Sequence, residues 1–102
     1  MPKQFLYILK RVPRLHDDSA WTKSDQEAVG RHFQRLQEAA GRGQVILAGR
    51  TQEPGKDTFG LVIFEVDDEA AAREFMETDP AVVAGAMTAK LHPYAVSVQR
   101  KG

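Results

Sequence analysis

Two short segments of this chain are apolar at almost every position, and this pattern limits the folds open to it. The first segment runs from Phe5 to Leu9 and the second from Phe59 to Phe64. Successive side chains of a strand point to opposite faces of a sheet, so both faces of these strands carry large apolar groups. A sheet with one wet face would alternate apolar and polar residues instead. We therefore expect a sheet that is covered on both faces.

The order of the expected elements predicts the fold class. Strands are expected at Phe5–Leu9, Gln44–Arg50, Thr58–Val66 and Lys90–Val98, with helices between the first and second and between the third and fourth. This βαββαβ order is typical of an α+β, ferredoxin-like fold with a four-stranded antiparallel sheet.

Local signals set the ends of the two helices. Ser24 and Glu27 form a capping-box pattern at the start of the first helix, and Gly41 and Gly43 supply its end. The second helix starts after the acidic run 67–69, where negative charge suits a helix N-terminus, and is broken at Asp79-Pro80.

Length and composition narrow the class of protein further. The 102 residues predict one domain, 1–102, with a thin core. The chain has no Cys, which excludes a disulfide scaffold and thiolate chemistry, and the formal net charge is +0, which argues against binding nucleic acid through a basic surface. No apolar run approaches the roughly 20 residues of a membrane span, so we expect a cytoplasmic protein without a membrane partner.

The second apolar face predicts self-association. Each large apolar side chain left wet would forgo roughly 1.5–3 kcal/mol of burial, and several together rival the stability of a small domain. We therefore expect a homodimer packed sheet to sheet. The alternatives are a partly exposed patch, or a third layer formed by the segment around Trp21.

His32 is the most unusual titratable residue of the first helix. At 100° per residue it shares a face with Ala28, Leu36 and Ala39, so its imidazole points toward the sheet. Such a ring needs a partner, because an unpaired buried polar group is costly. The residues alone favour a core histidine satisfied by backbone or a Tyr hydroxyl. A histidine held by a carboxylate would instead exchange protons near neutral pH.

Asp79 is the carboxylate best placed to pair with His32, because it lies in the break after the second helix. It has a second explanation, since Asp followed by Pro is a good N-cap and first residue for a turn over 80–83. The sequence leaves these two interpretations open.

Several of these features together resemble the YCII-related (YciI-like) family of small dimeric α+β-barrel proteins, over most of the chain from 5 to 98. They are His32 in its helix, the run Gln44–Gly49 after the Gly turn, Asp79-Pro80 followed by Gly85, and Pro93-Tyr94. The resemblance implies a ferredoxin-like subunit, a homodimer and an active site built on His32 and Asp79.

The same resemblance implies a class of chemistry. The family's best-known reaction is dehalogenation of a chlorinated muconolactone, although most members have no assigned reaction. We therefore expect an acid–base lyase, isomerase or dehydrohalogenase that acts on a small carbonyl or lactone-type molecule without a cofactor. A non-catalytic ligand-binding or regulatory dimer is the alternative, and it would lose no rate when His32 is changed.

Three further residues are candidates for binding the small molecule. Arg50 ends the second expected strand and could hold a substrate carboxylate, although a strand-end Arg is more often solvated. Tyr94 stands where a Trp is common in the family, and Tyr7 lies on the first expected strand. We assign substrate binding to these three residues.

Two other functions are weaker fits. His16, Asp17 and Asp18 are adjacent loop residues without a third ligand at a suggestive spacing, so we expect no metal site. The segment 57–64 matches part of an RNA-recognition signature, but Asp57 replaces its basic residue and Leu61 its second stacking aromatic. An RNA-binding module is therefore the last alternative.

Overall fold

One antiparallel sheet organises the part of the chain that the computed structural model describes, residues 2–101. Within these residues the sheet has four strands in the order β2-β3-β1-β4, and its neighbouring pairs are all antiparallel. The strands are β1 Lys3–Arg11, β2 Val45–Arg50, β3 Gly60–Val66 and β4 Met87–Pro93. The helices are α1 Lys23–Gly41, α2 Glu69–Glu77 and the short α3 Pro80–Val83.

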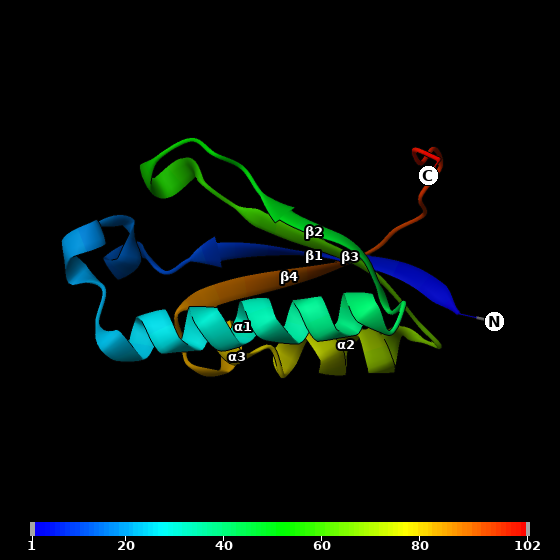
Figure 1. Ribbon diagram of the computed structural model, residues 1–102, viewed down its shortest axis with the longest axis horizontal. Coiled ribbons are helices and arrows are strands. Elements are labelled where there is room, and N and C mark those ends of the chain that lie inside the picture. The colour runs from blue at the N-terminus through cyan, green and yellow to red at the C-terminus, as the bar shows by residue number, and fades with distance from the viewer. Residues whose placement is uncertain (1, 102) are drawn as a thin grey trace.

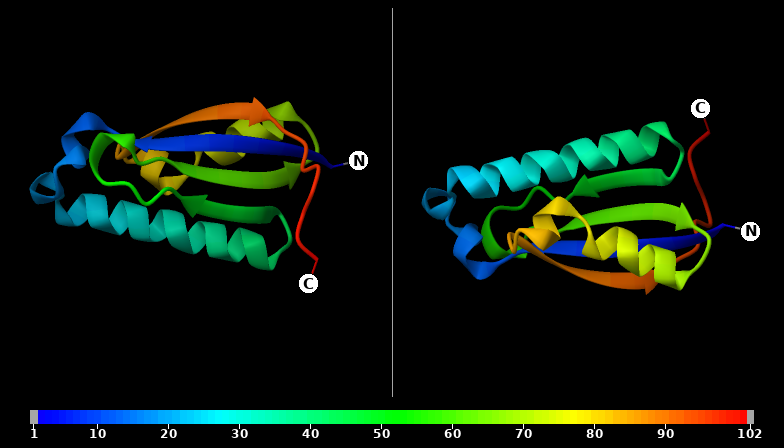
Figure 2. Two further views of the ribbon diagram at one scale, coloured as in Figure 1. Left: turned by 90° about the horizontal axis from the view of Figure 1, so that it is seen from above. Right: turned by 90° about the horizontal axis from the view of Figure 1, so that it is seen from below.

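All three helices lie on one face of the sheet (Figure 1). Seen along that face, α1 runs beside β2, while α2 lies over β3 and β4 (Figure 2). The short α3 follows α2 directly and contacts α1. The ferredoxin-like βαββαβ fold expected from the sequence is confirmed. No helix within residues 2–101 is long and apolar enough to cross a membrane.

The start of α1 differs from the predicted capping box. Its N-cap is Thr22, which accepts a hydrogen bond from the Asp25 amide, and the Asp25 carboxylate accepts one from the Thr22 amide. Ser24 and Glu27 were therefore the wrong pair. Arg14 stabilises the cap formed by Thr22 and Asp25, because it forms a bidentate ion pair with Asp25 at 2.7 and 3.0 Å. The C-terminal end is as predicted, since α1 ends at Gly41 and Gly43 has a φ of 82°.

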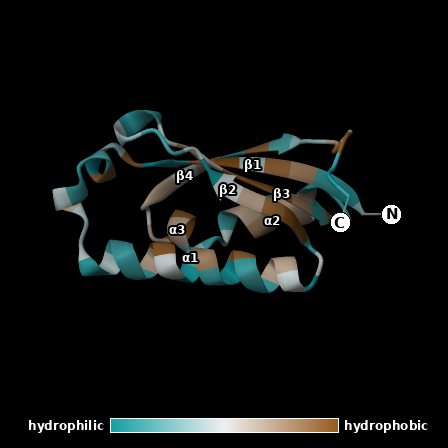
Figure 3. Cartoon of the chain, turned by 45° about the horizontal axis from the view of Figure 1, so that its top comes forward, coloured by the Kyte–Doolittle hydropathy of each residue, from teal (hydrophilic) through white to brown (hydrophobic). Residues whose placement is uncertain are grey.

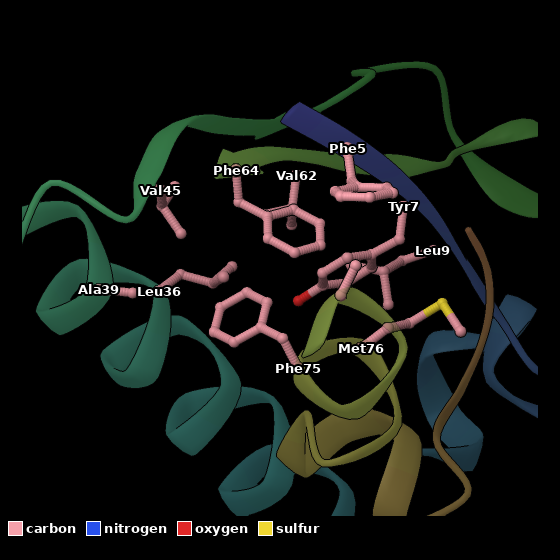
Figure 4. Packing of buried hydrophobic residues seen from close by; sticks show 11 residues of the cluster. Phe5, Tyr7, Leu9, Leu36, Ala39, Val45, Val62, Phe64, Phe75 and Met76 are labelled. Atoms are coloured by element: carbon pink, nitrogen blue, oxygen red, sulfur yellow. The ribbon is translucent and has the colours of Figure 1, made fainter. Parts of the chain in front are cut away.

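The core lies between the helices and the sheet, and the odd-numbered side chains of β1 belong to it. Phe5, Tyr7 and Leu9 point to the helices beside Val62 and Phe64 of β3 (Figure 4). The ring centroids of Phe64 lie 5.5 Å from Tyr7 and 4.9 Å from Phe75, distances at which aromatic pairs stabilise a core. The centres of these strands are accordingly hydrophobic in Figure 3.

The opposite face of the sheet is also apolar, as the sequence predicts. Leu6 and Ile8 of β1 pair with Ile63 and Leu61 of β3 on this face. Ile63 is buried, whereas the other three side chains are half-buried within a single chain. Tyr7 and Phe64 lie in the core, so neither ring is available to stack on bases at this face, as an RNA-binding module would need.

The last strand lies earlier in the chain than predicted. The sequence pattern placed it at 90–98, but β4 spans Met87–Pro93 and residues 94–101 have no regular structure. Gly85, with a φ of 74°, turns the chain straight into β4. The remaining segment crosses one end of the open face (Figure 2), where the Val96 amide donates to the Gln4 side-chain oxygen at 2.7 Å.

The aromatic core predicts an uneven response to truncation. Phe64→Ala is expected to lower the free energy of unfolding by about 3–5 kcal/mol, because a fully buried ring is replaced by a cavity. Phe33→Ala is the matched control: its side chain is 61% exposed, so the loss should stay within about 0.5 kcal/mol. Urea titrations followed by circular dichroism measure both values. Equal losses would contradict this description of the core.

Candidate active site

His32 lies on the side of α1 that faces the sheet. The fully buried Ala28 and Ala39 and the buried Leu36 share this side, and the His32 side chain is only 12% exposed. The helical period therefore predicts its direction correctly. The neighbouring Phe33 is largely exposed and borders a cavity instead of the core.

Asp79 lies in the break between α2 and α3, and its side chain is 0% exposed. The two interpretations of its sequence position are both observed. Its Oδ1 accepts a hydrogen bond from the Ala81 amide at 2.9 Å, which caps α3. Both carboxylate oxygens also lie within hydrogen-bond distance of His32 Nδ1, at 2.8 and 2.7 Å. One carboxylate therefore caps a helix and holds an imidazole.

The protonation states of the pair follow from these contacts. Burial opposes the charge on Asp79, but hydrogen bonds from His32, Tyr7 and the Ala81 amide together hold the pKa of its carboxyl below the usual value. An ionised carboxylate is an acceptor only, so the proton between the two residues lies on His32 Nδ1. This leaves Nε2 as the ring nitrogen that is turned away from Asp79.

Tyr7 completes the buried cluster from the sheet. Its hydroxyl donates to Asp79 Oδ2 at 2.8 Å, and the residue is fully buried. Burial and the adjacent Asp79 carboxylate raise the pKa of Tyr7 far above its usual value, so it stays protonated as a donor. The sequence assigned Tyr7 to substrate contact, but its hydroxyl is committed to Asp79 and it does not line the neighbouring cavity.

Arg35 fastens the turn that carries Asp79 to α1. It lies one turn after His32 and donates to the Phe75 carbonyl oxygen and to Thr78 Oγ1, both at 2.8 Å. Its guanidinium also lies over the Phe75 ring, 4.2 Å from the centroid. These contacts tie the end of α2 to α1, and they thereby help to hold Asp79 at its distance from His32.

A cavity of about 810 Å³ opens beside His32, between α1 and the β2–β3 end of the sheet. Its walls are mostly apolar and include the chain's single Trp, Trp21, which also donates from Nε1 to the Leu15 carbonyl oxygen. His32 lines this cavity, and because Asp79 holds Nδ1, Nε2 is the ring nitrogen left to contact a ligand.

Of the remaining candidate residues, Arg50 lines the cavity and Tyr94 does not. Arg50 lines the cavity, because a bulge between Val45 and Leu47 shifts the register of β2 and puts Arg50 opposite Gly60. Tyr94 follows β4, which is the edge strand opposite β2, and it does not line the cavity. Arg11 also lines the cavity, and our sequence interpretation missed it. Its signal was the alternation of β1, in which the odd-numbered positions face the helices.

The acidic loop after β1 is used for local structure. Asp17 accepts hydrogen bonds from the amide and hydroxyl of Ser19 and caps a short 3₁₀ turn. Within residues 2–101, no three His, Asp or Glu side chains gather in an arrangement that could hold a metal ion.

The lowered pKa of Asp79 predicts how stability depends on pH. A carboxyl whose pKa is depressed by folding stabilises the protein above its unfolded value, about 3.9, and this contribution is lost as pH falls below it. Asp79→Asn is therefore expected to be less stable than the wild type near neutral pH, with a difference that shrinks below about pH 4. Urea titrations between pH 7 and pH 3 measure this difference. A difference independent of pH would contradict the ionised state of Asp79.

Comparison with known proteins places the chain in a family. The fold is similar to that of 5-chloro-2-hydroxyhydroquinone dehydrochlorinase (TftG) from Burkholderia phenoliruptrix AC1100, solved in complex with 2,5-dihydroxybenzoquinone. The TM-score is 0.61 at 19% sequence identity, over 90% of this chain and 93% of that chain. No curated protein matches the chain by sequence. The pattern of the YCII-related domain matches residues 6–91, and the chain therefore belongs to the YCII-related family.

Proposed function

We propose that this protein is an acid–base enzyme that acts on a small carbonyl or lactone-type molecule, with His32 as the proton-transferring group. The observation that carries this proposal is the contact of His32 Nδ1 with the fully buried carboxylate of Asp79, at the edge of a cavity. A carboxylate in that position orients the ring and fixes its tautomer.

The proposed reaction begins with proton removal by Nε2. A C–H bond next to a carbonyl group breaks, its proton moves to Nε2, and its electron pair forms a double bond to the carbonyl carbon while the C=O π electrons move to oxygen. Where the next carbon carries chlorine, the carbonyl group re-forms, the double bond shifts to that carbon, and chloride leaves with the electrons of the broken carbon–chlorine bond. The proton on Nε2 later passes to water or back to the product, so an elimination or an isomerisation follows from the same first step.

The structural neighbour supports this class of reaction without identifying the substrate. The neighbour is named as a dehydrochlorinase, and elimination of hydrogen chloride needs a base but no redox cofactor. Tyr7 and Arg35 act as positioning residues in this proposal, because they contact Asp79 and its turn and not the cavity. Arg50 is proposed to contact the substrate, and Tyr94 remains a prediction from the family resemblance.

We also propose that two copies of this chain pack through their open sheet faces. Leu6, Ile8 and Leu61 stay half-buried in the single chain, although its own C-terminal segment crosses one end of this face. Covering the remainder would remove these side chains from water, which favours association by roughly 25 cal/mol per Å² of apolar area.

The catalytic proposal predicts the effect of changing His32. His32→Gln is expected to lower kcat for chloride release about 10²- to 10⁴-fold, the usual contribution of a positioned acid–base group. The assay uses 5-chloro-2-hydroxyhydroquinone and a chlorinated muconolactone as substrates. His16→Gln is the matched control, because His16 lies outside the cavity and its loss should leave kcat unchanged. Undiminished turnover by His32→Gln would refute the proposal, and binding without turnover by the wild type would favour the regulatory alternative.

The dimer proposal predicts the effect of a charge on the open face. Ile8→Lys places an ammonium group at the centre of this face and is expected to shift the protein from dimer to monomer. Val83→Lys is the control, because Val83 is 70% exposed on α3, away from the sheet. Sedimentation velocity over a concentration series measures the state of each protein. A wild type that stays monomeric at every concentration would end this proposal.

A further inference from the structure

The cavity beside His32 is lined by two arginines that form no ion pair with any acidic side chain that the structure describes. Arg11 and Arg50 both line it, and none of its lining residues within the described range is acidic. The ion pairs found among residues 2–101 include neither of these two arginines. Because its walls are mostly apolar, the cavity weakens solvent screening of this charge.

Arg11 is held in place by one contact and keeps further donors free. It is the last residue of β1, opposite Met87, and its Nη2 donates to the Gly55 carbonyl oxygen at 2.9 Å. Its Nε is buried and has no hydrogen-bond partner among residues 2–101. Because this Nε is closed to solvent, a ligand in the cavity would be contacted through the terminal Nη groups of Arg11. The contact with Gly55 orients the planar guanidinium, and an oxyanion is the acceptor that such a group pairs with best.

The shape of the cavity indicates an apolar body attached to the anionic group. Small residues occupy wall positions where larger side chains would fill the space: Gly30 on α1 and Ala48 on β2. Leu9 and Phe33 contribute apolar walls on opposite sides. The volume of about 810 Å³ is within the range of small-molecule sites and exceeds what an inorganic anion needs.

We propose that this cavity binds a ring-sized organic anion whose carboxylate or ionised hydroxyl pairs with Arg11, while the exposed Arg50 attracts it at the mouth. This inference rests on the proposed function in naming the anion as the substrate of His32. The two cations have a chemical role there, because proton removal beside a carbonyl group builds negative charge on oxygen, which fixed positive charge stabilises. Arg11 is therefore assigned to the substrate's charged group and His32 to its reacting carbon.

The test compares two probes that differ in charge and have nearly the same shape, benzoate and benzamide. Trp21 reports binding directly, because it is the chain's only Trp and lines the cavity, so ligands are expected to change its fluorescence. Benzoate is expected to bind about tenfold or more tightly than benzamide, as for a charge-assisted hydrogen bond, with an affinity that falls as salt is raised.

Two variants assign the preference to the arginines. Arg11→Gln is expected to weaken benzoate to the level of benzamide while leaving benzamide binding unchanged. Arg50→Gln is expected to weaken benzoate binding by a smaller factor, because Arg50 is exposed. The Gly55 carbonyl accepts its hydrogen bond from Arg11, so Arg50→Gln leaves that contact intact. Arg73→Gln, on the exposed side of α2, is the control and should change neither affinity.

Three results would overturn the proposal. The first is no fluorescence response to benzoate, and the second is equal affinity of the wild type for the two probes. The third is that Arg11→Gln weakens the binding of both probes equally while Arg50→Gln weakens neither. The last result would assign Arg11 to the support of the loop at Gly55. Because these experiments measure binding without turnover, they separate the anion site from the catalytic proposal. A benzoate preference that depends on the arginines stands even if His32→Gln keeps full activity.

Discussion

The burial of one carboxylate is the constraint on which the rest of this structure depends. A charge fully removed from water is strongly destabilising unless hydrogen bonds replace its hydration. Asp79 obtains them from Tyr7 on β1, from His32 on α1 and from the Ala81 amide at the start of α3. The sheet and two helices are thereby held to a common point, and displacement of any one of them would remove one of the three partners of the buried charge.

The same contacts determine the chemistry that the fold can support. Since Asp79 occupies His32 Nδ1, the imidazole has one nitrogen left, and His32 also lines the cavity. Arg35 maintains the separation by tying the end of α2 to α1. Folding and the proposed proton transfer would therefore rely on one set of interactions, so a change that loosens the cluster is expected to affect both.

Local patterns in the sequence predicted the element order and the inward direction of His32, because alternation and helical period act over a few residues. They could not decide whether Asp79 pairs with His32, since its role as a cap already explains Asp-Pro and the pairing depends on tertiary packing. Arg11 was missed because its contact with Gly55 is long-range and arises only when β1 meets the β2–β3 loop. The C-terminal segment was misplaced because apolar alternation alone does not show where a strand ends.

The tautomer of His32 tests the central claim most directly. With an ionised Asp79 as the acceptor, the neutral imidazole must carry its proton on Nδ1 and leave Nε2 as the free base. A ¹⁵N–¹H correlation spectrum of the ring, recorded at a pH where the imidazole is neutral, distinguishes the two nitrogens. The account predicts a protonated Nδ1 and an unprotonated Nε2. A proton on Nε2 would show that Asp79 does not accept a hydrogen bond from the ring, and Nε2 could then not act as the proposed base.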